Sequence, residues 1–208
     1  DIGLGIPAEP LFRSSIRDAL ITFIKERGEA PKRVFIHFYK KMNGTEWKDF
    51  MRIVSRLGGD IPIITATIYK SEESTMVAFD ESEKDMMPYS GTYIKTGDST
   101  FLLYNNVKYD SEKFQQKVKQ SEDSSRLYHL PLKVDIVCRN YKEEEKNTLI
   151  DNVLAQCYQL SRMCWSTVDQ QNVPITVKYP SMLAKQVPFF ENDIIPNPEF
   201  SCSNLWFI

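Results

Sequence analysis

The sequence predicts a single α/β domain. In the first 70 residues two helical patterns alternate with two short apolar runs, the order expected when parallel strands are joined by helical crossovers. A chain of 208 residues can bury one sizeable core and is short for two domains. With 42% hydrophobic and 26% charged residues, the composition excludes a largely disordered chain. No apolar run approaches the roughly 20 residues of a membrane-spanning helix, so no membrane partner is expected.

The first half of the chain predicts two helices and two buried strands. A helix is expected from Pro10 to Gly28, because apolar residues recur three and four apart between an early proline and a closing glycine. Residues 33–39 are aromatic and β-branched and predict a buried strand. After the turn at Asn43-Gly44, a second apolar pattern predicts a helix that ends at Gly58-Gly59. Residues 62–69 form the second predicted strand.

The second half predicts shorter elements. Four short strands are expected at Thr75–Phe79, Gly91–Lys95, Phe101–Tyr104 and Leu132–Val137. Residues 108–125 are rich in lysine, glutamine and serine and predict a loop or a mobile helix. A long helix is expected over about 143–163, with one apolar face. We then expect a strand at Pro174–Lys178 and a short helix at Ser181–Gln186.

Charge and cysteine content constrain the class of protein. The net charge of −2 gives no global reason to expect nucleic acid, although the 11 basic and 8 acidic residues among the first 60 allow a local basic face. The four cysteines include no Cys-x-x-Cys pair, so neither a zinc site nor a disulfide scaffold is expected. No signal peptide is visible, and a cytoplasmic location suits these free thiols. Because the chain starts at Asp1 rather than methionine, we expect it to be part of a longer polypeptide.

The residues alone indicate no active site. A metal-dependent nuclease needs converging carboxylates, yet residues 33–39 and 62–69 contain no acid. Asp135 alternates with apolar neighbours and is expected on the solvent side of its strand. His37 is expected to be a core histidine, and neither it nor His129 lies in a serine or cysteine nucleophile motif. No glycine-rich phosphate loop is present.

Several segments nevertheless resemble one family in unbroken order over residues 9–208. Residues 158–168, followed by 173–184, resemble the helix and the Tyr-containing segment that end the PIWI domain of Argonaute proteins. The ending 204–208 resembles the aromatic and aliphatic C-terminus of short prokaryotic Argonautes. Residues 31–39 and 63–70 are similar to two successive PIWI strands, the first of which ends in Arg-Asp-Gly, and residues 88–92 to a Pro-x-Gly-Thr turn.

The resemblance implies an RNase H-like fold, a mixed sheet flanked by helices, whose first strand precedes residue 1. Residues 1–208 would then be the PIWI domain that ends a longer MID–PIWI protein. The catalytic aspartate of the family would fall at Tyr39, or at Lys40 if the register slips by one residue, and the fourth catalytic position at Ser181. A phenol and a hydroxyl are poor ligands for Mg²⁺ or Mn²⁺, so the resemblance implies a catalytically inactive member.

Two alternatives remain open at this stage. One is an active metal-dependent RNase H-like nuclease, which would need carboxylates from the missing strand and an unexpected register that brings in Asp135. The other is an interaction domain that binds no nucleic acid.

The inactive branch of the family implies partners and binding residues. Short Argonautes hold a guide RNA or DNA, pair it with a complementary target, and act in prokaryotic defence with an APAZ-domain protein that carries a TIR, Sir2 or nuclease effector. The resemblance implies that the C-terminal carboxylate of Ile208 helps to hold Mg²⁺ or Mn²⁺ against the guide 5′ phosphate. The expected nucleic-acid-binding residues are Lys70, Thr92, Arg162, Tyr179 and Lys185.

Overall fold

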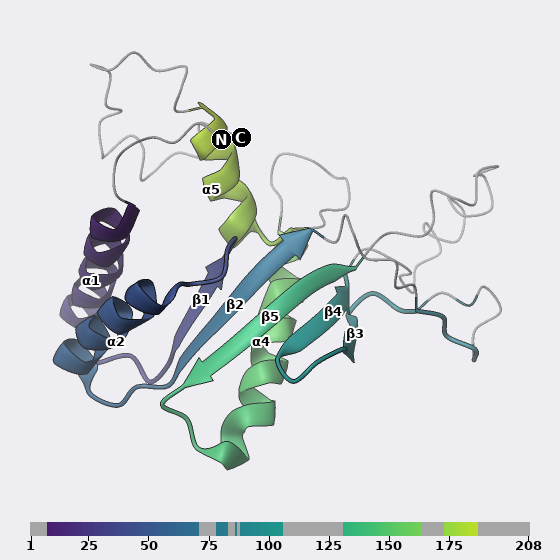
Figure 1. The fold of residues 1–208 in the computed structure, drawn as a ribbon, viewed down its shortest axis with the longest axis horizontal. Helices are drawn as coiled ribbons and strands as arrows, with labels where there is room; N and C mark the ends of the chain where they lie inside the picture. The colour runs from purple at the N-terminus through teal and green to yellow at the C-terminus, as the bar shows by residue number, and fades with distance from the viewer. Residues whose placement is uncertain are drawn as a thin grey trace.

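The computed structural model of the chain describes residues 8–70, 78–82, 86, 88–105, 131–163 and 173–186 (Figure 1). Within these residues one sheet contains the strands β1 (Val34–Phe38), β2 (Ile63–Lys70), β3 (Thr92–Lys95), β4 (Thr100–Tyr104) and β5 (Leu132–Arg139). The helices of the described residues are α1 (Ala8–Arg27), α2 (Gly44–Gly58), α4 (Lys146–Ser161) and α5 (Ile175–Gln186).

The sheet is mixed, with the strand order β1-β2-β5-β4-β3. Strands β1 and β2 are parallel and joined through α2, as the alternation of patterns predicts, whereas the other neighbouring pairs are antiparallel. The register places His37 beside Ala66, and Ala66 beside Ile136. Since residues directly opposite each other share a face of the sheet, these three side chains point to the same side.

The two faces of the sheet carry separate hydrophobic clusters. On one face α4 packs over the middle strands, where Ile64, Val134, Leu149 and Leu154 are almost fully buried. On the other face α1 and α2 cover β1 and the start of β2 around the buried Phe50. Figure 1 shows this layering, with α4 and the pair α1 and α2 on opposite sides of the strands. The apolar spacing predicted for these helices therefore corresponds to real packing faces.

Helix α2 begins at a complete capping box. The Asn43 side chain accepts hydrogen bonds from the backbone N–H groups of Thr45 and Glu46, both at 2.9 Å. The Glu46 carboxylate in turn accepts from the Asn43 N–H at 2.8 Å and from Lys40 Nζ at 2.9 Å. Burial by itself raises the pKa of Glu46, but these two hydrogen bonds outweigh it and leave that pKa lowered.

The structure corrects the prediction for residues 174–186. Instead of a strand and a short helix, these residues form the single helix α5. The β-branched residues near its start favour a strand, but the Pro174 carbonyl accepts the N–H groups of Val177 and Lys178 at 2.9 Å and opens the helix. Val177 then packs against the core under α4. Pro180 inside the helix lacks one N–H donor, and this tertiary packing outweighs the loss.

The remaining predicted helices, and the predicted strands at 33–39, 62–69, 91–95, 101–104 and 132–137, are recovered with small shifts. The long helix is preceded by a 3₁₀ turn at Glu143–Glu145, and α4 itself ends at Ser161. The predicted strand Thr75–Phe79 lies partly outside the described residues, and its described part, Ala78 and Phe79, is not in a strand. The predicted loop at 108–125 also lies outside them.

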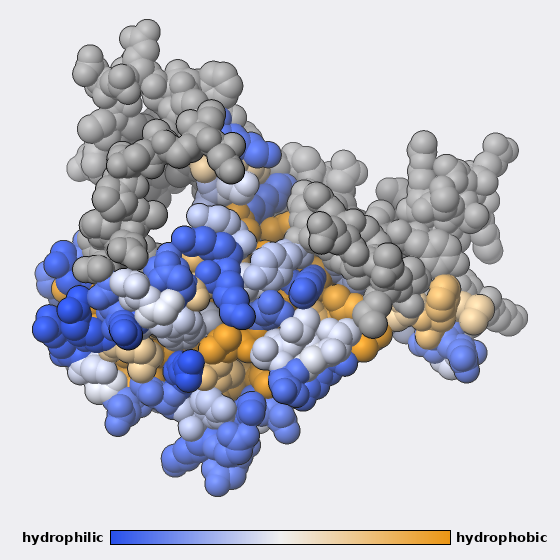
Figure 2. All heavy atoms as spheres, in the orientation of Figure 1, coloured by the Kyte–Doolittle hydropathy of each residue, from blue (hydrophilic) through white to orange (hydrophobic). Residues whose placement is uncertain are grey.

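The described surface is mainly hydrophilic on the face that Figure 2 shows. Figure 2 shows blue side chains over most of the described part of this face, with hydrophobic ones in smaller patches. Within the described residues, no helix combines the length and the hydropathy that crossing a membrane requires. Cys138 and Cys157 are both described and both are free thiols.

Candidate functional site

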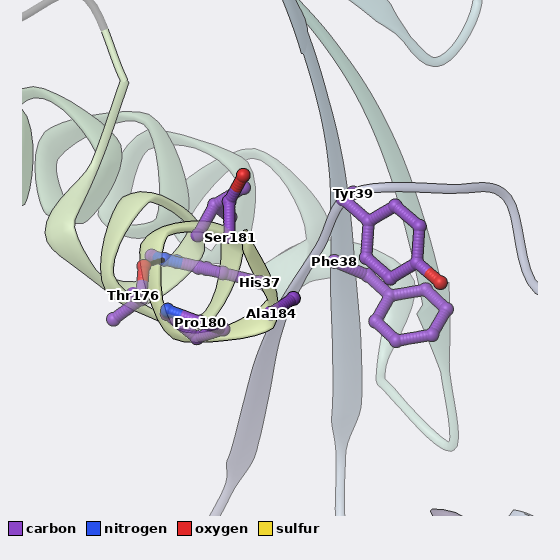
Figure 3. Close-up of a pocket in the computed structure, with 8 residues that line it drawn as sticks. His37, Phe38, Tyr39, Thr176, Pro180, Ser181 and Ala184 are labelled. Atoms are coloured by element: carbon purple, nitrogen blue, oxygen red, sulfur yellow. Dashed lines mark hydrogen bonds between the residues drawn. The ribbon is translucent and has the colours of Figure 1, made fainter. Parts of the chain in front are cut away.

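A cavity of about 570 Å³ lies between the end of β1 and α5 (Figure 3). Its described lining comes from two segments far apart in the sequence: His37, Phe38, Tyr39, Thr176, Val177, Pro180, Ser181 and Ala184. The end of strand β1 and the residue that follows it supply one wall, and successive turns of α5 supply the other. Most of these described residues are apolar, and the polar groups among them are one imidazole, one phenol and two hydroxyls.

Tyr39 and Ser181 both line this cavity. Tyr39 follows the last residue of β1 and is 66% exposed, with its ring centroid 5.2 Å from that of Phe38. Ser181 lies on the exposed part of α5. In Figure 3 the Phe38 and Tyr39 rings lie beside each other at one side of the cavity, and Ser181 projects from the helix at the other. The fold therefore brings together the two positions at which the family resemblance places replaced catalytic residues.

His37 joins three elements at the inner end of the cavity. Its Nδ1 lies 2.9 Å from Thr176 Oγ1 on α5, and its Nε2 lies 3.9 Å from Cys157 Sγ on α4. Burial lowers the pKa of His37, so the imidazole is neutral at neutral pH. Burial also raises the pKa of the Cys157 thiol to about 12, which leaves it protonated and unreactive. His37 is hydrogen-bonded, as predicted. It is half-buried, however, and not fully buried as a core histidine would be.

The low pKa of His37 makes stability depend on pH. The unfolded chain protonates this histidine near its ordinary pKa of 6.5, whereas the folded chain resists protonation. Folding stability from this group is therefore complete above pH 6.5 and is lost as the pH falls below that value. We expect His37→Gln to flatten the dependence of the unfolding free energy on pH over this range, measured by urea denaturation.

The matched control for this prediction is Asn152→Ala, a change at an exposed, uncharged position on α4, which should keep the native pH dependence. Equal loss of stability on acidification in the native chain and in His37→Gln would contradict the assignment to His37.

The donor set at the cavity does not suit a divalent cation. None of the described residues that line it is a carboxylate, and Mg²⁺ and Mn²⁺ prefer carboxylate oxygens. Across the described residues, no three His, Cys, Asp or Glu side chains converge to hold a metal ion. Asp135 accepts a hydrogen bond from Thr100 Oγ1 at 2.7 Å. It alternates with Ile136, which shares a face with His37, so Asp135 lies on the opposite side of the sheet.

The remaining predicted binding residues are distributed over several elements. Tyr179 is half-buried and Lys185 is exposed, both on α5, and Arg162 is exposed just after α4. Partial burial lowers the pKa of Arg162, whose guanidinium nevertheless stays charged at neutral pH. Lys70 ends β2, but its side chain lies outside the described residues, as does the whole of Ile208.

Thr92 does not join the first cavity and lines a second one of about 440 Å³. This second cavity lies between the start of β3 and α4, where the Tyr93 hydroxyl donates a 2.7 Å hydrogen bond to Asp151. The sequence reasoning did not predict it, because Tyr93 and Asp151 are far apart and neither belongs to a motif. The one sequence feature that pointed to the second cavity is Gly91, the glycine of the Pro88–Thr92 turn.

The sheet order, the helices on both faces and the mixed strand directions together constitute an RNase H-like α/β fold. The crystal structure of Aa-Ago with externally bound siRNA matches it with a TM-score of 0.52 and 18% sequence identity, over 91% of this chain and 22% of that one. The Piwi protein of Archaeoglobus fulgidus is 31% identical over 97 residues, which are 47% of this chain and 21% of that protein. No family model matches. The chain spans about a fifth of each protein, and the two similarities support a PIWI-like domain.

Proposed function

We propose that this chain is the non-slicing PIWI domain of a short Argonaute, which holds a guide strand and pairs it with a complementary target without cutting the target. In this proposal residues 1–208 follow a MID domain, and target recognition is signalled to an APAZ-domain effector protein in prokaryotic defence. The similarity to a Piwi protein and to an Argonaute described with bound siRNA supports a nucleic-acid partner.

The observation that carries the proposal is the composition of the cavity between β1 and α5. Tyr39 and Ser181, the positions at which the resemblance places two catalytic residues, line one cavity, and no carboxylate is found in the described part of its lining. The first acidic residue after β1 is Glu46, whose carboxylate is engaged by Lys40 and by the cap of α2. Asp135, which the nuclease alternative needs, lies on the other face of the sheet. A guide-binding role without cleavage accounts for the lack of a carboxylate in the described lining and for the position of Asp135 on the other face.

Nucleic-acid binding is compatible with the net charge of −2, because only the surface that follows the phosphates has to be basic. Helix α5 carries Lys178 and Lys185, which lie two helical turns apart and therefore on one face. Arg162 follows α4, and Lys70 ends β2. Base pairing between guide and target would supply the sequence specificity, while these cations contact the backbone.

A divalent cation at the guide 5′ phosphate completes the proposal. Mg²⁺ or Mn²⁺ would relieve the repulsion between that phosphate and the carboxylate of Ile208.

The proposed phosphate contacts make a specific prediction about salt. If Lys70, Arg162 and Lys185 each neutralise a phosphate, replacing any one with alanine should weaken binding of all guide sequences alike. The slope of log K against log salt should also become shallower by about one unit for each phosphate that is no longer neutralised. Fluorescence anisotropy with 5′-phosphorylated RNA and DNA oligonucleotides at several salt concentrations measures both quantities.

Lys48→Ala is the matched control for these variants. Lys48 is exposed, as Arg162 and Lys185 are, but lies on α2, on the opposite side of the sheet from α5. Its removal should leave the slope unchanged. If all four variants keep the native slope, the three residues do not contact phosphate.

A further inference from the structure

One wall of the second cavity consists of aromatic and aliphatic side chains. Gly91 has a φ of +99°, and a Cβ there would lie 3.6 Å from the Tyr158 ring, so the backbone turn packs directly on that ring. Leu103 and Leu154, at 1% and 2% exposure, also line the cavity and are fixed in the core. The Tyr93–Asp151 hydrogen bond ties β3 to α4 at this point and, together with burial, raises the pKa of Tyr93. The cavity is therefore a fixed feature of the packing between the hairpin and the helix.

Strand β3 next to this cavity forms an edge of the sheet that no other described strand covers. It is the last strand of the sheet, pairs with β4 alone among the described strands, and all four of its residues are exposed (Figure 1). The Thr96 N–H bonds to the Thr100 carbonyl at 2.9 Å. In an antiparallel pair the residues alternate between those whose backbone groups face the partner and those whose groups face away. The backbone groups of Tyr93 and Lys95 therefore face away from β4.

The chemistry of the cavity favours a basic side chain. Asp151 is the one charged residue in its described lining, and a carboxylate repels the phosphates of a nucleic acid. The rings of Tyr93 and Tyr158 are able to attract a cation through their faces. Leu154 provides apolar surface for the methylene groups of an arginine or lysine. The bases of a nucleic-acid strand could stack on the two tyrosine rings, but its phosphates would be repelled by Asp151. A protein segment with a basic side chain is therefore the better match.

We propose that the edge of β3 and the second cavity form one docking site for an extended segment of a partner protein. The segment adds to the sheet as a strand beside β3 and places an arginine or lysine, opposite Tyr93, into the cavity against Asp151. Side chains alternate with a period of two, so the residue two positions away on the segment lies opposite Lys95. An acidic residue there would complement the Lys95 ammonium. The predicted recognition pattern is a basic residue, any residue, and an acidic residue in an extended peptide.

Selection from a library of random displayed peptides on the full chain tests this site. We expect the enriched peptides to contain the basic–any–acidic pattern. Their affinity should fall about tenfold in Asp151→Asn, the loss expected for one charge-assisted hydrogen bond. Asp98→Asn is the matched control, because Asp98 is an exposed carboxylate in the turn after β3 that does not line the cavity, and it should keep native affinity.

A second pair of variants tests strand addition separately from charge. Both variants lose the lysine side chain beyond Cβ or replace it, but Lys95→Pro also removes the outward-facing N–H, a change that an edge strand tolerates, whereas Lys95→Ala keeps that N–H. We expect Lys95→Pro to weaken the selected peptides more than Lys95→Ala, with circular dichroism confirming that both variants are folded.

Three results would overturn the proposal. The first is that no peptide is enriched or that the enriched peptides lack a basic residue. The second is that they bind Asp151→Asn as tightly as the native chain. The third is that a single-stranded oligonucleotide, rather than a peptide, shifts the NMR amide signals of Gly91 and Tyr93, since that would assign the cavity to a nucleobase.

Discussion

A target strand paired to a guide on this protein in its full-length form is expected to remain uncut. In RNase H-like chemistry two divalent ions must be held by converging carboxylates, so that the attacking and leaving oxygens are both stabilised. The cavity at which the family resemblance places this chemistry has four polar side chains in its described lining, those of Tyr39, Ser181, His37 and Thr176, and no carboxylate there. The measurement is denaturing electrophoresis of end-labelled target after incubation with guide-loaded protein and Mg²⁺ or Mn²⁺.

The control for this assay is retention of the intact target by the same preparation, shown by a mobility shift, so that lack of cleavage is measured on a loaded protein. Metal-dependent cleavage at one position opposite the middle of the guide would contradict the proposal and favour the active nuclease instead.

The largest expected effect on stability is that of Leu149→Ala. Leu149 is completely buried between α4 and the sheet, in the cluster that also includes Ile64 and Val134. Truncation removes apolar contacts and leaves a cavity, so we expect the free energy of unfolding to fall by about 2–5 kcal/mol. Against a typical domain stability of about 5–15 kcal/mol, this is a large share. Urea denaturation followed by circular dichroism measures it.

Asn152→Ala on the same helix is the comparison, because Asn152 is exposed and its replacement should change stability by less than about 0.5 kcal/mol. If Leu149→Ala cost no more than Asn152→Ala, then α4 would not pack on the sheet through this face.

The elements that the sequence predicts well are those whose pattern matches their packing. The run at 33–39 and the run at 62–69 are short, apolar and flanked by turn residues, and both are strands within a residue or two of the expected bounds. The alternation at Asp135 is also correct, since Val134 and Ile136 are buried and Asp135 faces the other side. In each case the local pattern and the tertiary environment agree.

Helix α5 shows where local patterns mislead. Ile175 and Val177 are β-branched and Pro180 follows closely, so short-range preferences favour a strand and a helix start. The helix instead depends on contacts with distant residues, including the hydrogen bond between Thr176 and His37. Such contacts have no signature in the neighbouring sequence, and tertiary packing overrides propensity at this site.

The candidate site was only partly predictable for the same reason. Tyr39 and Ser181 were singled out through the family resemblance, and only the fold brings them to one cavity. The second cavity depends on Tyr93 and Asp151, which meet because the β3–β4 hairpin packs beside α4. Pairings of this kind follow from the strand order β2-β5-β4-β3, in which β2 lies beside β5 although β3 and β4 come between them in the chain.

The central claim is that this protein holds a nucleic-acid guide, and sequencing the nucleic acids that co-purify with the full-length protein tests it most directly. We expect short strands of narrow length distribution that share the chemistry of their 5′ ends. A double variant, Arg162→Glu with Lys185→Glu, should retain much less of this material, because each substitution replaces an attraction to phosphate with a repulsion. Fragments of random length, or equal amounts bound to the native protein and the double variant, would contradict the claim.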